Sequence, residues 1–153
     1  MNGKDLLMKQ RKRENVKLIR SLYRAIDRGD WATARQLVDP NIEWNEPHAP
    51  GLWFSGRHCG IDNVFREVID PARDKFDNLH LKIKKLFPIG QHVVALGVFH
   101  GYEKTEGLLL EAPTAHIWTL RDGKAIRFEA YDDVLEWHFA LGVTSFQPKL
   151  MAA

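Results

Sequence analysis

The stretch APTAHIWTLRDGKAIRFEAYDD, residues 112–133, predicts two long strands joined by a tight turn at Asp122-Gly123. A two-residue Asp-Gly loop lets both central residues adopt positive φ, which matches the right-handed twist of the flanking strands. We expect this hairpin to form the floor of a curved sheet. Apolar residues alternate with polar or amphipathic ones in its second strand, so one face should be buried: Ile126, Phe128 and Ala130 alternate with Arg127, Glu129 and Tyr131.

Size and composition are those of an ordinary globular domain. The chain has 153 residues, enough for one domain with a sizeable core. No apolar run approaches the roughly 18 residues of a membrane helix, and the N-terminal residues lack the apolar core of a secretory signal. We therefore expect a soluble, cytoplasmic protein. Cys59 is the only cysteine, which excludes an intrachain disulfide and a multi-cysteine metal site.

Basic residues are concentrated near the N-terminus, although the net charge of the whole chain is only +2. The cluster lacks the interleaved aromatic residues that single-strand binding favours. A solvated helix face is the preferred interpretation, and we expect neither nucleic acid nor a membrane as partner. The cluster consists of Lys9, Arg11, Lys12, Arg13, Lys17 and Arg20.

Two helices are predicted before the sheet. Residues 4–28 contain neither proline nor glycine, and apolar residues recur along them at spacings of three and four. Gly29 is suited to end this helix in a left-handed turn, and Asp30 can cap the next helix by accepting from its free N–H groups. The second helix should be short, because Pro40 follows its apolar face.

Residues 42–46 are a predicted short strand, in which period two places Trp44 and Glu46 on the same side. Residues 47–60 hold two prolines and three glycines, which indicates a loop, but Trp53 and its neighbours are apolar enough to fold inward.

The remaining elements complete the predicted fold class. Residues 61–69 have the apolar spacing of a third helix, which should end near Pro71 and cover the sheet. Further strands and a short final helix are expected at residues 79–84, 93–102, 108–120 and 134–141. The sequence therefore predicts an α+β fold, with a strongly curved, mixed but mainly antiparallel sheet wrapped around three helices of the N-terminal half.

The order of these elements and several motifs resemble those of SnoaL-like proteins in the ketosteroid-isomerase-like, nuclear-transport-factor-like superfamily. The resemblance covers about residues 15–137, so we expect one SnoaL-like domain over residues 1–153. It implies a cone-shaped, cystatin-like α+β barrel that binds a small apolar ligand and pairs as a homodimer through its sheet. The motifs are Gly29-Asp30, Trp44-x-Glu46-Pro47, the loop-into-helix at 56–64, AP-x-AH-x-W at 112–118 and RDGKAIRFEAYDD at 121–133.

The resemblance also suggests which residues carry chemistry. It implies that Glu46 falls where ketosteroid isomerases hold their general-base carboxylate. It places Ala115 where they have an oxyanion-hole aspartic acid, and Leu22 rather than Tyr23 at their tyrosine. Ala130 falls where epoxide hydrolases of this fold carry an acid. Neither reaction is therefore expected in its known form.

Three residues are the candidate catalytic groups. Glu46 could abstract a proton next to a carbonyl if apolar neighbours raised its pKa; the alternative is a carboxylate that caps a helix or pairs with Arg57. His48 lies two residues further on, in the loop, and is a candidate relay. Asp132 is in phase with Phe128 and could reach the mouth of the cone.

Aromatic and small residues are the candidate ligand contacts. His116 and Trp118 share the opposite strand face from Ala115 and Ile117, and are expected to point away from the cone, towards a partner subunit. We expect no metal, since no third ligand completes a site, and no cofactor, since nucleotide-binding motifs are absent. The predicted ligand-binding residues are Tyr23, Trp44, Trp53, Phe65, Phe99, Ala115, Ile117, Phe128 and Ala130.

Two functions remain open from the sequence. The first is a cofactor-independent acid–base enzyme, an isomerase, cyclase or lyase, that binds a small hydrophobic carbonyl or polycyclic ligand and uses Glu46. The second is a non-catalytic ligand-binding or dimerisation module. An open cavity containing the Glu46 carboxyl favours the enzyme, whereas a cavity filled by Trp53 or Phe54 favours the module.

Overall fold

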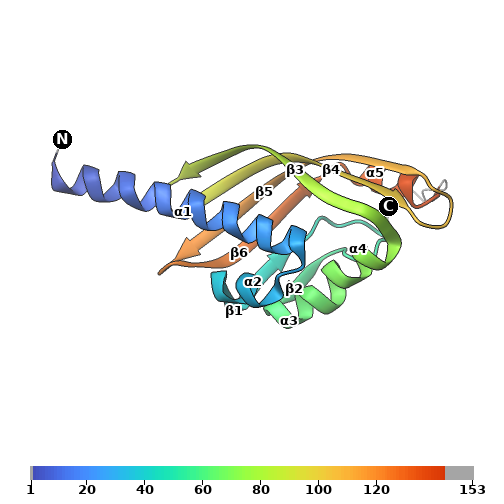
Figure 1. Cartoon of the computed structure of the whole chain (residues 1–153), viewed down its shortest axis with the longest axis horizontal. Coiled ribbons are helices and arrows are strands. Elements are labelled where there is room, and N and C mark those ends of the chain that lie inside the picture. Colours follow the sequence, from blue (N-terminus) through green and yellow to red (C-terminus); the bar gives the residue numbers. More distant parts are fainter. Residues whose placement is uncertain (1, 144–153) are drawn as a thin grey trace, which may run out of the picture.

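The computed structural model describes residues 2–143, which form an α+β fold (Figure 1). The helices are α1 (Gly3–Arg28), α2 (Trp31–Leu37), α3 (Ile61–Val64), the π-helical segment η1 (Phe65–Ile69), α4 (Asp70–Lys75) and α5 (Val134–Ala140). The strands are β1 (Val38–Asn45), β2 (Arg57–Cys59), β3 (Phe76–Ile89), β4 (His92–Glu103), β5 (Leu109–Arg121) and β6 (Lys124–Asp132).

A single curved sheet carries the fold, with the strand order β2-β1-β6-β5-β4-β3. Its β1–β6 pair is parallel and its other pairs are antiparallel, so the predicted fold class is confirmed, although the sheet stays open at β2 and β3. Helices of the N-terminal half lie against one side of it, and the first turns of α1 extend beyond it (Figure 1). Met1 and residues 144–153 of the predicted domain lie outside the described residues.

The ends of the first two helices follow from their capping residues. Gly29 ends α1 in the left-handed conformation, with φ of 69°. Asp30 then caps α2 by accepting from the N–H of Thr33 at 3.1 Å. Both caps were predicted and are confirmed. None of the helices within residues 2–143 is long and apolar enough to cross a membrane.

The third predicted helix is longer than expected. It continues through η1 and α4 to Lys75, so Pro71 lies inside it rather than ending it. The reason is a wider π turn, in which the N–H of Asp70 donates to the carbonyl of Phe65. Pro71 is therefore the second residue of α4 and directly follows this wider turn.

The hairpin that dominates the sequence forms as β5 and β6. Both turn residues have positive φ, 50° at Asp122 and 73° at Gly123, as the two-residue Asp-Gly turn predicts. The hairpin occupies the middle of the sheet, between β1 and β4. It thus supplies the floor that the sequence predicts.

A β-bulge at Ile126 changes the register of this hairpin. Leu120 pairs with Ala125, but the preceding residue, Thr119, pairs with Arg127, so Ile126 is the extra residue. Ala125 is fully buried and Ile126 is partly exposed, which reverses the predicted burial of Ile126. Because side chains alternate between the two faces of a strand, this one extra residue changes which side chains of β5 and β6 lie on the same face of the sheet.

The bulge decides which side chains of β5 face the interior. Uniform pairing from the turn would place Ile117 opposite Phe128, but Trp118 takes that position. His116 and Trp118 are consequently 4% and 1% exposed, and the prediction that they point towards a partner subunit is wrong. Ala115 and Ile117, predicted to contact a ligand, lie instead on the outer, partly exposed face.

Candidate active site

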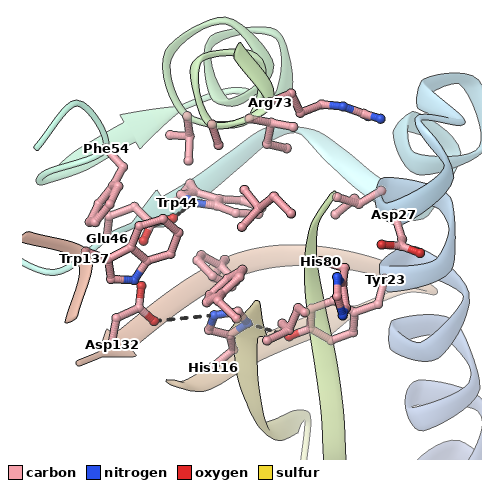
Figure 2. A pocket seen from close by; sticks show the side chains of 18 of the residues that line it. Tyr23, Asp27, Trp44, Glu46, Phe54, Arg73, His80, His116, Asp132 and Trp137 are labelled. Carbon is pink, nitrogen blue, oxygen red and sulfur yellow. Dashed lines mark hydrogen bonds and ion pairs between the residues drawn. The ribbon is translucent and has the colours of Figure 1, made fainter. Parts of the chain in front are cut away.

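A cavity of about 170 Å³ lies between the sheet and the helices (Figure 2). Its size is similar to the roughly 150 Å³ of an apolar cavity that holds benzene. Most of the wall is aromatic or aliphatic, with two carboxyl groups at one end and charged side chains at the rim. The lining residues are Tyr23, Ile26, Asp27, Trp44, Glu46, Trp53, Phe54, Val68, Ile69, Ala72, Arg73, Leu79, His80, Leu81, Phe99, His116, Trp118, Phe128, Asp132 and Trp137.

The aromatic wall is held by ring contacts across the sheet. The Trp44 ring stacks on Phe128, with centroids 3.8 Å apart, because β1 and β6 are parallel neighbours that place these residues side by side. Trp118 meets both rings, with centroids 5.5 Å and 4.7 Å away. Each of the three rings in this part of the wall therefore packs against the other two.

Glu46 follows the last residue of β1 and directs its carboxyl group into the cavity. The residue as a whole is half-buried, and the indole N–H of Trp44 donates to Glu46 Oε1 at 2.6 Å. Burial, and then the negative charge of Asp132, raise the pKa of Glu46 to about 8, against the opposing effect of the Trp44 hydrogen bond. Arg57 is ion-paired with Glu43 at 3.0 Å, so it does not neutralise Glu46 as the alternative interpretation proposed.

Asp132, the last residue of β6, supplies the second carboxyl group. Its side chain is 4% exposed and accepts a hydrogen bond from the Thr114 hydroxyl. Burial raises the pKa of Asp132 to about 6, and the Thr114 hydrogen bond opposes that shift. Figure 2 shows Asp132 and Glu46 at the same end of the cavity, beside Trp137.

Two hydrogen bonds link Trp118, Tyr23 and His116 in the cavity wall. Trp118 Nε1 donates to the Tyr23 hydroxyl oxygen at 2.8 Å, and that hydroxyl lies 2.6 Å from His116 Nδ1. Burial raises the pKa of Tyr23 far above its usual range and lowers the pKa of His116 to about 3, so both groups are neutral.

These bonds select one tautomer of His116. An indole N–H can only donate, so the Tyr23 oxygen accepts from Trp118, and within the described residues the Tyr23 hydrogen has only His116 Nδ1 as acceptor. The ring proton of His116 is therefore on Nε2. That atom lies 3.8 Å from Asp132 Oδ1, beyond hydrogen-bond length, and leaves an N–H directed at the carboxyl end of the cavity.

The two carboxyl groups can take opposite roles in proton transfer. Both pKa values are raised by burial, but to different extents, about 6 for Asp132 and about 8 for Glu46, so near pH 7 Asp132 is mainly ionised and Glu46 mainly protonated. A base and an acid thus share one mainly apolar space, as general acid–base catalysis requires. Among residues 2–143, no three His, Cys, Asp or Glu side chains are grouped so as to hold a metal ion.

The structure brings most of the predicted site residues together. Six predicted ligand-binding or catalytic residues of the strands and loops line the cavity. They are Trp44, Glu46, Trp53, Phe99, Phe128 and Asp132. Tyr23 of α1 also lines it, whereas Leu22, which the resemblance aligned with a catalytic tyrosine, is buried in the core.

Other predicted site residues lie outside the cavity wall. His48 is exposed in the loop after β1, which removes the geometric basis for a relay. Phe65 packs on Trp31 with ring centroids 4.9 Å apart. Ala130 is buried opposite His116 but does not reach the cavity.

Sequence reasoning missed the inward positions of His116 and Trp118 and the contribution of Trp137. The first two depend on the bulge at Ile126, which the alternation of residues does not reveal. Trp137 lies on α5, which packs on β5. Val134 and Trp137 are apolar residues three positions apart, and this spacing is the sequence signal for a buried helix face.

The fold and sequence match a known family. The model of the SnoaL-like domain family matches residues 19–128. The comparison with curated proteins gives no match.

This chain covers nearly the whole length of several solved structures of the same fold. An NTF2-like protein from Burkholderia thailandensis E264 is 28% identical, with a TM-score of 0.76 over 83% of this chain and 96% of that one. TerC, co-crystallised with polyporic acid, is 23% identical, with a TM-score of 0.75 over 84% and 98%. IdmH, a candidate polyketide cyclase from Streptomyces antibioticus, is 20% identical, with a TM-score of 0.70 over 84% and 99%. The last two show a likeness of fold alone.

Proposed function

Because the chain belongs to the SnoaL-like domain family and its cavity holds two buried carboxyl groups, we propose that it is a cofactor-independent acid–base enzyme. Its substrate is a small hydrophobic carbonyl compound, and its reaction is of the isomerase, cyclase or lyase type. The observation that carries this proposal is the pair formed by Glu46 and Asp132, whose pKa values are about 8 and about 6.

The order of these pKa values assigns the roles. Asp132, ionised at neutral pH, takes a proton from the carbon next to the carbonyl group. The C–H electron pair moves into the new C=C bond, and the carbonyl oxygen gains the negative charge of an enolate. Glu46, protonated at neutral pH, returns a proton to the intermediate. Glu46 is thus the acid in this proposal, although the sequence favours it as the base.

The cavity favours a compact, mainly apolar substrate. A volume of about 170 Å³ accommodates about one aromatic ring with a short substituent, which is a smaller ligand than a polycyclic one. Trp53 and Phe54 form part of the wall and leave this space open. The co-crystal of TerC with polyporic acid supports a small organic ligand for this fold.

Deuterium exchange tests this proposal without knowledge of the natural substrate. In D₂O, we expect the protein to accelerate exchange of the methyl protons of acetophenone, measured by proton NMR. The rate should be highest between about pH 6 and pH 8, because Asp132 must be ionised and Glu46 protonated. Saturable binding of acetophenone without any acceleration would contradict catalysis and favour the non-catalytic binding module.

We also propose that the protein pairs through the outer face of its sheet. Leu96, Ala115 and Tyr131 are neighbours across β4, β5 and β6 on that face. Leu96 is 36% and Tyr131 60% exposed, so they form an apolar stripe that a second copy would cover. Trp118, which the sequence assigned to this interface, has no part in it because it faces the cavity.

Replacing Leu96 with Glu should convert a dimer to a monomer, because the stripe would then bury an unpaired charge. Sedimentation velocity at micromolar concentration measures the change. Leu6→Glu is the control, since Leu6 is also exposed, at 56%, but lies on α1, away from the sheet. A wild-type protein that sediments as a monomer would refute the proposed pairing.

A further inference from the structure

Trp137 carries an unsatisfied donor in the wall of the cavity. The residue is 4% exposed, and its buried Nε1 has no hydrogen-bond partner within residues 2–143. The other indoles of the wall are paired: Trp44 with Glu46, Trp53 with the Val68 carbonyl at 3.0 Å, and Trp118 with Tyr23. A buried N–H without an acceptor is rare and costly in folded proteins.

The ring of Trp137 is held in place, so its donor has a defined position. Aromatic side chains surround it on several sides, with ring-centroid distances between 5.2 and 5.9 Å. The helix that carries it begins at a capped N-terminus, where Asp133 accepts from the N–H of Glu136. The neighbours of the Trp137 ring are Trp53, Phe54, Phe76 and Phe99.

No hydrogen bond joins Trp137 Nε1 to either of the nearby carboxyl groups within residues 2–143, and each of those groups binds another donor. Glu46 Oε1 accepts from Trp44, and Asp132 accepts from Thr114. An indole N–H can only donate, so it needs an acceptor atom. An oxygen of a bound molecule meets that need, and it would lie at the end of the cavity where Figure 2 shows Trp137 beside both carboxyl groups.

We infer that the Trp137 indole N–H donates to the carbonyl oxygen of the ligand. This inference rests on the proposed function, which places a carbonyl compound in the cavity. The bond would orient the ligand with its polar oxygen at the carboxyl end and its apolar body against the aromatic wall. It also supplies an oxygen-binding donor from α5, whereas the resemblance places the oxyanion donors of the isomerases at the positions of Leu22 and Ala115.

Two probes of similar size separate this bond from general apolar binding. Acetophenone and ethylbenzene share the ring, but only acetophenone has an acceptor oxygen. We expect the wild-type protein to bind acetophenone about threefold to tenfold more tightly, as for one neutral hydrogen bond. Calorimetric or fluorescence titration measures both affinities. Trp137→Phe should lower their ratio to one or below, because the carbonyl oxygen of acetophenone would then be buried without a donor.

Trp53→Phe is the matched control. It makes the same substitution in the wall of the same cavity, but the N–H that it removes is already bonded to the Val68 carbonyl. The ratio of the two affinities should therefore stay at its wild-type value, even if both affinities fall. A second measurement needs no variant: the Trp137 indole N–H resonance of the wild-type protein should move downfield with acetophenone and not with ethylbenzene.

Several results would overturn the inference. An affinity ratio near one in the wild-type protein would do so, as would an unchanged ratio in Trp137→Phe or the absence of binding of both probes. The fourth such result is a Trp137 indole N–H resonance that does not move downfield when acetophenone binds. If acetophenone exchange is accelerated while the affinity ratio is near one, the donor is wrong and the proposed function stands. If the ratio is high but exchange is not accelerated, the donor is supported and catalysis fails.

Discussion

Asp132→Asn is expected to lower the rate of deuterium exchange into acetophenone by about 10²–10⁴-fold, the usual contribution of a positioned general base. The amide keeps the shape of the side chain and can still accept from the Thr114 hydroxyl, but it cannot take a proton from carbon. Proton NMR in D₂O at pH 7 gives both rates. The affinity for acetophenone should change much less than the rate.

Glu129→Gln is the control for this experiment. It also converts a carboxyl group of β6 to an amide, but Glu129 lies on the other face of the strand, in an ion pair with Arg127 at 2.9 Å. Its exchange rate should equal that of the wild-type protein. If Asp132→Asn retained full activity with unchanged binding, Asp132 would be excluded as the base.

Glu46→Gln should stabilise the fold at high pH relative to the wild-type protein. The pKa of Glu46 is raised from 4.5 in the unfolded chain to about 8 in the fold, so its contribution to stability is complete below pH 4.5 and is lost as the pH rises to about 8. Glutamine stays neutral throughout and can still accept from Trp44. Between pH 5 and pH 9, the difference in unfolding free energy between variant and wild type should grow by about 3–5 kcal/mol.

Urea denaturation at the two pH values measures this difference. Glu43→Gln is the control, because Glu43 also belongs to β1 but its carboxyl group forms surface ion pairs with Arg57 and Arg127. Its stability difference from the wild-type protein should change little with pH. Taking the difference in unfolding free energy between each variant and the wild-type protein also removes the contribution of His116 to the pH dependence, because all of these proteins contain His116. An equal response of the two variants would show that the Glu46 carboxyl is not buried in solution.

Local signals in the sequence predicted most of the fold. Gly29 and Asp30 mark the end of one helix and the cap of the next, and Asp122-Gly123 marks the hairpin turn, because each depends on the backbone of a few adjacent residues. The position of Glu46 on the same side of its strand as Trp44 was likewise readable from period two, and both line the cavity.

The sequence by itself therefore determined most of the elements, their order and both carboxyl groups of the site, Glu46 and Asp132. It did not reveal the strand β2, which lies within the predicted loop 47–60 and forms by pairing with β1. Only the tertiary structure decided which face of β5 lines the cavity, because the register depends on the unpaired residue Ile126 rather than on the alternation of the strand. That single residue brings His116 and Trp118 inward and turns Ala115 outward. The pKa values of Glu46 and Asp132 depend in the same way on burial, which is a property of the assembled cavity.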